Sequence, residues 1–468
     1  MVLVLETSTS AAKALLYSSE AGIVAEESRP YPLSISDSGK QDTEGVFRAA
    51  LEAGRKVAAG RDVAAVAVSG IWHGIAICDK DMRPAAPAYT WTFTGASELC
   101  RKTREDKEAA ARLYTRTGCM PNVTYQPYTL RYLADHGMVL KDKLLSSQAG
   151  YNFYRLTGER LETASMISGM GFLDIRTLTY SGDALAFAGV GEEQFGGLST
   201  YQTTCPLTQE CAALLGIASG VPVVTPHPDG ALNQVGSGAT VPGVMTFSVG
   251  TSAAIRLSAD RPILSDPPGT WCYVGAEGWM CGAATAGACN CVNWFKEVLL
   301  ENKWSFRELE STLLDDRETP VFLPFLFGER CPGWRDDRRG GFCEIGGGAT
   351  APRLFQAICE GVLFNLYQCY EILTRYTKPP ERVILSGGIL NSTAWSQLAA
   401  DIFGRDITLS RAAQASMLGG AALALRAAGG ISSLQEFADT SGRTLSPREG
   451  AAAVYRKKYE RYLDCYHR

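Results

Sequence analysis

Glu6-Thr7-Ser8-Thr9-Ser10-Ala11-Ala12, near the start of the chain, has a close counterpart just past the middle, Gly250-Thr251-Ser252-Ala253-Ala254. Each stretch follows an apolar run suited to a buried strand, residues 2–5 and 244–249, and each continues into a second apolar run. The pattern therefore predicts strand, tight polar turn and strand at both places. One such turn alone favours an ordinary hairpin. Repetition at nearly half the chain length instead indicates two related halves that face each other across a cleft.

The composition of the two turns indicates an anion site. Small hydroxyl residues and glycine offer backbone N–H groups and hydroxyls to one anion without a bulky side chain in the way. Two such turns can hold two ends of a polyphosphate. Thr9 and Ser10 in the first turn, and Gly250 and Thr251 in the second, are the predicted contacts. Lys13 either approaches a phosphate or lies on the hairpin surface.

Length and composition limit the classes of protein. A chain of 468 residues, 46% hydrophobic and 20% charged, fits two globular domains. A net charge of −4 argues against a nucleic-acid partner. No leader and no membrane-crossing run is found, so the expected location is cytoplasmic with no membrane partner. The 14 scattered cysteines, without Cys-x-x-Cys, indicate buried thiols in a reducing compartment. The oligomeric state is left open, a homodimer being one option.

Strand and helix patterns alternate through both halves, which predicts an α/β protein. The repeat sets the domain boundary, giving domains 1–240 and 241–468. A capping box at Ser446-Pro447-Arg448-Glu449 predicts the start of the last helix. Further strands are predicted at residues 23–26, 64–68, 222–225 and 382–385, and helices at residues 42–57, 98–113, 287–300, 352–376, 394–403 and 413–428.

Two carboxylates stand at predicted strand ends. Asp229 ends a strand and starts a helix, fixed between Pro228 and Gly230. In phosphoryl transfer the acceptor hydroxyl loses its proton late, so a well-placed carboxylate suffices as base. A helix N-cap is the structural alternative for Asp229. Glu6 could hold Mg²⁺ directly or through water, or could be an exposed strand-end acid.

Two glycine-containing segments of the second half differ from ordinary surface loops. Gly387-Gly388 follows a predicted strand, where paired glycines let a flat ring such as adenine lie against the backbone; a plain tight turn is the alternative. The loop Gly328-Glu329-Arg330-Cys331-Pro332-Gly333-Trp334 is charged and constrained. Its role does not follow from spacing.

Taken in order, these motifs resemble the FGGY carbohydrate kinase family over nearly the whole chain. Its signature is carried by the two turns, Trp72-His73, the Gly-Glu-Arg loop, Ser386-Gly387-Gly388 and the later Ala400-Asp401. The resemblance implies two ribonuclease H-like domains of the actin and hexokinase superfamily around a central ATP cleft. It implies that Asp229 is the base and that Thr9, Gly250 and Thr251 contact phosphates. It also implies nucleotide-lining roles for Gly287, Asn293, Gly388 and Asn391.

Within the family, the phrases of this chain look most like gluconate kinases, with xylulose kinases next. This implies ATP- and Mg²⁺-dependent phosphorylation of a small open-chain sugar, sugar acid or polyol. Trp72, His73 and Trp91 are the predicted substrate contacts. A nucleotide-dependent sugar-binding regulatory protein with weak catalysis is the alternative.

Two departures from the family pattern motivate that alternative. Glu6 replaces the usual Asp on the metal side. Phe93 and Gly95 stand where relatives have the Asp and Arg of Trp-x-Asp-x-Arg. We therefore expect Phe93 to give the sugar pocket an aromatic face, and the substrate to have fewer hydroxyls or to be gripped elsewhere.

Overall fold

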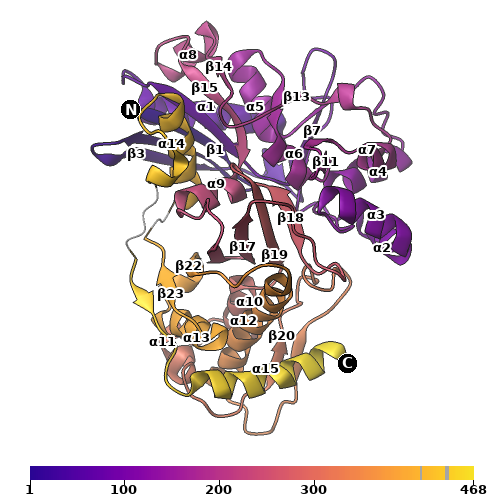
Figure 1. Cartoon of the computed structure of the whole chain (residues 1–468), viewed down its shortest axis with the longest axis vertical. Coiled ribbons are helices and arrows are strands. Elements are labelled where there is room, and N and C mark those ends of the chain that lie inside the picture. The colour runs from indigo at the N-terminus through magenta and orange to yellow at the C-terminus, as the bar shows by residue number, and fades with distance from the viewer. Residues whose placement is uncertain (412–413, 438–441) are drawn as a thin grey trace.

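The computed structural model describes residues 1–411, 414–437 and 442–468. It contains two large mixed sheets, one in each half (Figure 1). The first has the order β14-β15-β6-β1-β2-β3, formed by Thr204–Pro206, Pro222–Pro228, Ala65–Gly70, Val2–Thr7, Ala11–Ser18 and Gly22–Pro30. The second has the order β18-β19-β17-β16-β22-β23-β24, formed by Trp271–Val274, Trp279–Thr285, Ala253–Ala259, Val244–Val249, Arg382–Ser386, Ile407–Leu409 and Thr444–Leu445.

The two sheets share one topology. β1 pairs antiparallel with β2 and parallel with β6, which pairs parallel with β15. In the same way β16 pairs antiparallel with β17 and parallel with β22, which pairs parallel with β23. Each polar turn joins the two antiparallel central strands of its sheet. The predicted fold of two related α/β domains is therefore confirmed.

Helices and short strands complete the halves. A smaller sheet lies in the first half, in the order β4-β5-β8-β7-β9, formed by Ser36–Asp37, Lys40–Gln41, Ala88–Thr90, Gly74–Cys78 and Leu144–Ser146. The short pairs are β10-β13, β11-β12 and β20-β21, formed by Leu161–Thr163 with Gly197–Ser199, Leu173–Asp174 with Thr179–Tyr180, and Val321–Leu323 with Gly341–Cys343. Helices α1 to α9 span Thr43–Ala58, Ser97–Glu105, Lys107–Thr117, Gln126–Asp135, Gln148–Thr157, Ala164–Met170, Gly182–Ala188, Gln209–Leu215 and Asp229–Gly236. Helices α10 to α15 span Cys289–Trp294, Phe306–Leu309, Ala351–Tyr376, Thr393–Phe403, Ala415–Ala427 and Ala451–His467.

Several predicted boundaries are wrong, each for a local reason. The helix expected at 98–113 is divided at Asp106, which caps α3 by accepting from the Ala109 N–H. The helix expected at 287–300 starts at Cys289 and continues as a π-helical turn, Phe295–Leu299. The last helix begins at Ala451, because Arg448 binds the buried Asp401 (Nε to Oδ2, 2.7 Å) instead of entering the helix. Residue 413, the expected start of α14, lies outside the described residues.

Helix α14 belongs to the second half in sequence but packs on the first sheet. Met417 and Ala421 share an apolar cluster with Val4 of β1 and Ala67 of β6. Figure 1 shows α14, in yellow, beside the indigo strands near the N-terminus. The chain thus crosses between the halves a second time after residue 411.

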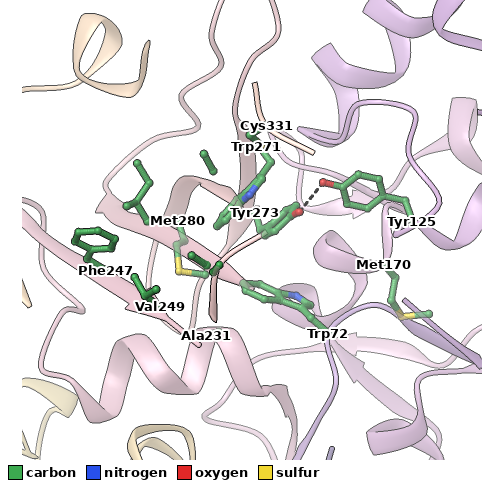
Figure 2. Packing of buried hydrophobic residues seen from close by; sticks show 14 of the residues in the cluster. Trp72, Tyr125, Met170, Ala231, Phe247, Val249, Trp271, Tyr273, Met280 and Cys331 are labelled. Atoms are coloured by element: carbon green, nitrogen blue, oxygen red, sulfur yellow. Dashed lines mark hydrogen bonds between the residues drawn. The ribbon is translucent and has the colours of Figure 1, made fainter. Parts of the chain in front are cut away.

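The halves also meet along β18. Tyr125 and Tyr273 share a hydrogen bond between their hydroxyls (2.6 Å), drawn dashed in Figure 2. The Val274 N–H donates to Ser168 Oγ (3.0 Å) and the Cys272 N–H to the Gly118 carbonyl (3.1 Å). These contacts bring aromatic residues of both halves together near Asp229. Among the described residues, no helix is both long and apolar enough to span a bilayer.

Candidate active site

Asp229 stands at the junction of β15 and α9. Pro228 occupies the cap position, and Asp229 is the first helical residue, so the N-cap alternative for Asp229 does not apply. Among the described residues, its Oδ1 accepts from the neighbouring Gly230 N–H alone (2.7 Å). The side chain is partly exposed. One carboxylate oxygen is therefore left for a substrate hydroxyl.

The surroundings of Asp229 set its basicity. Burial raises the pKa of Asp229 to about 6, and the carboxylate of Glu6 adds to the rise. The Gly230 N–H and the cations Arg256 and Lys13 act in the opposite direction. A carboxylate with this pKa is ionised at neutral pH and is a stronger base than an ordinary aspartate.

Glu6 is buried at the end of β1, only 2% exposed, and is therefore not the exposed acid of the alternative. In the register of the hairpin it faces Lys13, whose Nζ lies 3.3 Å from Oε1. The Ser69 hydroxyl donates to Oε2 (3.4 Å). Lys13 thus pairs with Glu6 and does not simply lie on the surface.

The residues around Glu6 fit a magnesium–nucleotide complex. Glu6 and Asp229 supply hard oxygen donors close enough for one charge to raise the pKa of the other. The described ranges contain no group of three or more His, Cys, Asp or Glu side chains that could hold a metal ion by itself. Mg²⁺ bound with a nucleotide commonly uses only one or two carboxylates, because phosphates and waters fill the remaining positions. A site built on Glu6 agrees with that pattern.

The first turn is held in place by its neighbours. The Thr9 carbonyl accepts from Gln41 Nε2 (3.0 Å) and from Ser36 Oγ (2.9 Å). The Trp91 indole N–H donates to Thr9 Oγ1 (3.0 Å). Ser10 is exposed at the tip. Trp91 therefore fixes the turn through its nitrogen and has only its ring left for a substrate.

The second turn opens onto a cavity of about 480 Å³. An aromatic wall formed by Phe306, Phe355 and Trp395 suits a flat base. Five residues predicted from the sequence line this cavity together: Gly250, Thr251, Asn293, Gly388 and Asn391.

The other two predicted nucleotide glycines have structural positions. Gly287 is buried, and a Cβ there would lie 2.0 Å from the Pro324 carbonyl oxygen, so it does not line the cavity. Gly387 has φ +94°, and a Cβ there would lie 2.5 Å from the Val249 carbonyl oxygen. Gly387 therefore lets the end of β22 approach the second turn closely.

A second cavity, of about 420 Å³, adjoins the first and shares Thr251 with it. Trp91, Thr92, Thr94 and Arg330 are part of its lining. Phe93 is not, because its ring packs on Tyr89 and Tyr132, with centroids 4.9 and 5.8 Å away. The expected aromatic face from Phe93 is wrong, since the side chain turns into the core of the first half.

His73 and Trp72 occupy different depths. His73 Nδ1–H donates to the Gly169 carbonyl (2.5 Å), which leaves Nε2 as an acceptor. Burial, with the charge of Arg330, lowers the pKa of His73 to about 3, so the ring is neutral. Trp72 is only 5% exposed and donates its N–H to the Ser165 carbonyl (2.8 Å). Trp72 is therefore a buried packing residue of the site, whereas the sequence predicted a substrate contact.

Sequence reasoning missed two arginines. Arg256 lies in β17, where its Nε is 3.8 Å from the position of a Cβ on Gly230, next to Asp229. Arg330 lines the second cavity, while its neighbour Glu329 is buried and held by the Gly333 N–H, Tyr466 and Arg338. A charged residue inside the apolar run of β17 was the available signal for Arg256. The unusual loop was the signal for Arg330.

Comparisons with known proteins agree with this geometry. A gluconokinase of Bacillus licheniformis is 26% identical, covering 97% of this chain and 93% of the relative. A xylulose kinase of Escherichia coli is 26% identical, covering 87% and 86%. The crystal structure of a gluconate kinase from Lactobacillus acidophilus matches with a TM-score of 0.93 at 26% identity, covering 99% of this chain and 97% of the other.

The match to family models spans both halves. The model of the N-terminal domain of the FGGY family of carbohydrate kinases matches residues 1–236, and the model of its C-terminal domain matches residues 245–428. Together with the paired sheets and the strand-end carboxylate between two polar turns, these matches show that the chain is a carbohydrate kinase and belongs to the FGGY family.

Proposed function

We propose that this kinase transfers the terminal phosphoryl group of ATP to a hydroxyl of a small open-chain sugar acid, with gluconate as the first substrate to test. The observation that carries the proposal is Asp229, a carboxylate whose pKa is raised to about 6, beside the Glu6–Lys13 pair. The similarity to gluconate kinases supports the choice of substrate class.

Each group has a role that follows from its position. Asp229 accepts the proton of the attacking hydroxyl through its free oxygen. His73, neutral and fixed by Gly169, accepts a hydrogen bond from another substrate hydroxyl at Nε2. Trp91 stacks on C–H faces of the substrate. The turns at Thr9 and Thr251 hold phosphate oxygens by N–H groups and hydroxyls.

Nucleotide and metal belong to the same proposal. The cavity lined by Asn293, Gly388 and Asn391 takes the adenosine, with its aromatic wall against the base. Glu6 would hold Mg²⁺, which supplies charge neutralisation to the phosphates when bound. Transfer in such sites depends on positioning and electrostatics, because the transition state is loose.

A ketopentose such as xylulose is the second candidate. The similarity to xylulose kinases favours it, and so do the hydroxyls of Thr92 and Thr94 in the second cavity. A cytoplasmic location is also proposed, supported by all 14 cysteines, each in the described ranges, being free thiols.

An ADP-release assay tests the substrate class. The enzyme is given ATP, Mg²⁺ and a panel of aldonates, ketopentoses and polyols, and kcat/KM is compared. We expect gluconate to give the highest value. A ketopentose at least about tenfold better than every aldonate would overturn the gluconate assignment and leave the kinase assignment standing.

A further inference from the structure

Two arginines of the site form no ion pair with an acid among the described residues, although the charge of Asp229 acts on Arg256 and that of Arg330 on Asp336. Arg256 makes one side-chain hydrogen bond, from Nη1 to Ser248 Oγ (3.0 Å), and its buried Nε has no acceptor. Arg330 makes no side-chain hydrogen bond or ion pair with any part of the chain that the structure describes, and its Nε is buried as well. Arg338, nine residues from Glu329, is by contrast paired with it (3.0 Å).

Arg256 lies beside Asp229, and Arg330 lines the second cavity. The Nε atom of Arg256 is 3.8 Å from the position that a Cβ on Gly230, the neighbour of Asp229, would occupy. Arg330 lines the cavity that also contains Trp91. The positive charges of both arginines lower the pKa of His73, so both arginines act on the same side chain. Neither arginine lines the proposed nucleotide cavity, which contains Asn293 and Gly388.

Two buried guanidinium nitrogens without a hydrogen-bond acceptor are costly unless an anion binds there. Burial lowers the pKa of Arg256, and the charge of Arg330 lowers it further. A carboxylate or a phosphate would offset both the lost hydration and the mutual repulsion. The planar fork of arginine donates two parallel hydrogen bonds to such an anion.

We propose that Arg256 and Arg330 bind the carboxylate of an open-chain sugar acid. This inference rests on the proposed function and names the residues that select its substrate class. It also explains how the site grips a sugar without the Asp and Arg that Phe93 and Gly95 replace. The phosphate of ATP is the competing anion, because Thr251 and Ser252 of the second turn line the same cavity as Arg330. The KM for ATP of the arginine variants distinguishes the two anions.

The test compares two substrates that differ only at the proposed anchor. D-gluconate and D-glucitol share their hydroxyl-bearing chain, and glucitol has CH₂OH in place of the carboxylate. We expect wild-type kcat/KM to be at least about a hundredfold higher for gluconate. Arg256→Gln and Arg330→Gln should each lower kcat/KM for gluconate about tenfold to a hundredfold, mostly through KM, and change the value for glucitol less than about threefold.

Controls separate the possible outcomes. Arg335→Gln alters an exposed arginine of the same loop and should leave both substrates unchanged. Arg256→Lys should recover part of the gluconate preference. Equal losses for both substrates together with a raised KM for ATP would assign the arginines to phosphate and overturn the proposal. If both Gln variants kept the wild-type kcat/KM for gluconate, the proposal would also be overturned, and the proposed function would stand.

A direct binding measurement covers the case in which turnover is absent. Calorimetric titration of the wild-type enzyme with gluconate, without ATP, should show binding that Arg256→Gln weakens about tenfold or more. An enzyme that turns over no sugar yet binds gluconate through these arginines contradicts the proposed function alone. Gluconate binding that is absent or unchanged in the variant contradicts the carboxylate site.

Discussion

Asp229 is the residue on which the proposed chemistry depends. Its position between Pro228 and Gly230 is a local feature, so its place at the end of a strand and the start of a helix could be predicted from the sequence. The pairing of Glu6 with Lys13 is likewise local to one hairpin. The buried Nε atoms of Arg256 and Arg330 that lack an acceptor could not be predicted, because this depends on which groups surround them in three dimensions. The inward turn of Phe93 also required the structure, since its partners Tyr89 and Tyr132 come from other elements.

Replacing Asp229 by Asn tests its role as base. We expect kcat to fall by at least about a hundredfold, with nucleotide binding and the unfolding midpoint retained, because the amide cannot take the proton. Single-turnover kinetics and a nucleotide titration measure the two effects separately. Turnover near the wild-type level would remove Asp229 from the mechanism.

The raised pKa of Asp229 also predicts the pH profile. Below about pH 6 the carboxylate is protonated and cannot act as base, so kcat should decline about tenfold per pH unit on the acid side. Above that pH the carboxylate is ionised and the profile should be level through pH 8. A rate that stays constant down to pH 4.5 would show that another group is the base.

Glu6 is expected to affect both the Mg²⁺ dependence and the pH profile of kcat. Glu6→Gln should raise the Mg²⁺ concentration for half-maximal rate several-fold, because a neutral amide offsets no metal charge. It should also move the acid limb to lower pH, since the charge of Glu6 raises the pKa of Asp229. Gln41→Ala, which removes a hydrogen bond to the Thr9 carbonyl on the same side of the site, should alter neither the metal dependence nor the limb. If Glu6→Gln left both quantities at wild-type values, the metal site would have to be sought elsewhere.

At the scale of elements, strands and long helices could be predicted, but their ends could not. The strand-turn-strand repeats are encoded by apolar runs and small turn residues, and α12 by its apolar face. The division at Asp106 and the late start of α15 depend on individual contacts, the cap on Ala109 and the pairing of Arg448 with Asp401. The crossing of α14 to the first sheet has no signal in its own periodicity, because a small-residue helix packs equally well on either half.

The packing of α14 against α9 predicts a stability effect. A Cβ at Gly419 would lie 2.0 Å from the Leu232 carbonyl oxygen, so Gly419→Ala must push the two helices apart. We expect it to lower the free energy of unfolding by about 1–3 kcal/mol. Gly182→Ala at the start of α7, where a Cβ meets nothing within 4 Å, should be neutral or slightly stabilising. Equal urea midpoints for the two variants would contradict the close helix contact.

At the scale of the whole molecule, the two halves are joined around the site by contacts far apart in sequence. Asp336 accepts from Arg104 (3.1 Å) and from Asn122 Nδ2 (2.6 Å) at the edge of the second cavity. Tyr125 and Tyr273 connect the halves behind His73. The repeat in the sequence predicted that two halves would face each other. It could not predict which side chains would meet, because neither half contains the information alone.

The most direct test of a sugar-acid kinase is the identity of its product. Enzyme, Mg²⁺, ATP and gluconate are incubated, and phosphorus NMR follows the nucleotide and any phosphate ester together. The account predicts one phosphorylated gluconate for each ADP in the wild type, and neither product above background over the same time with Asp229→Asn. ADP released with inorganic phosphate in place of a sugar phosphate, or ester formation undiminished in Asp229→Asn, would contradict it.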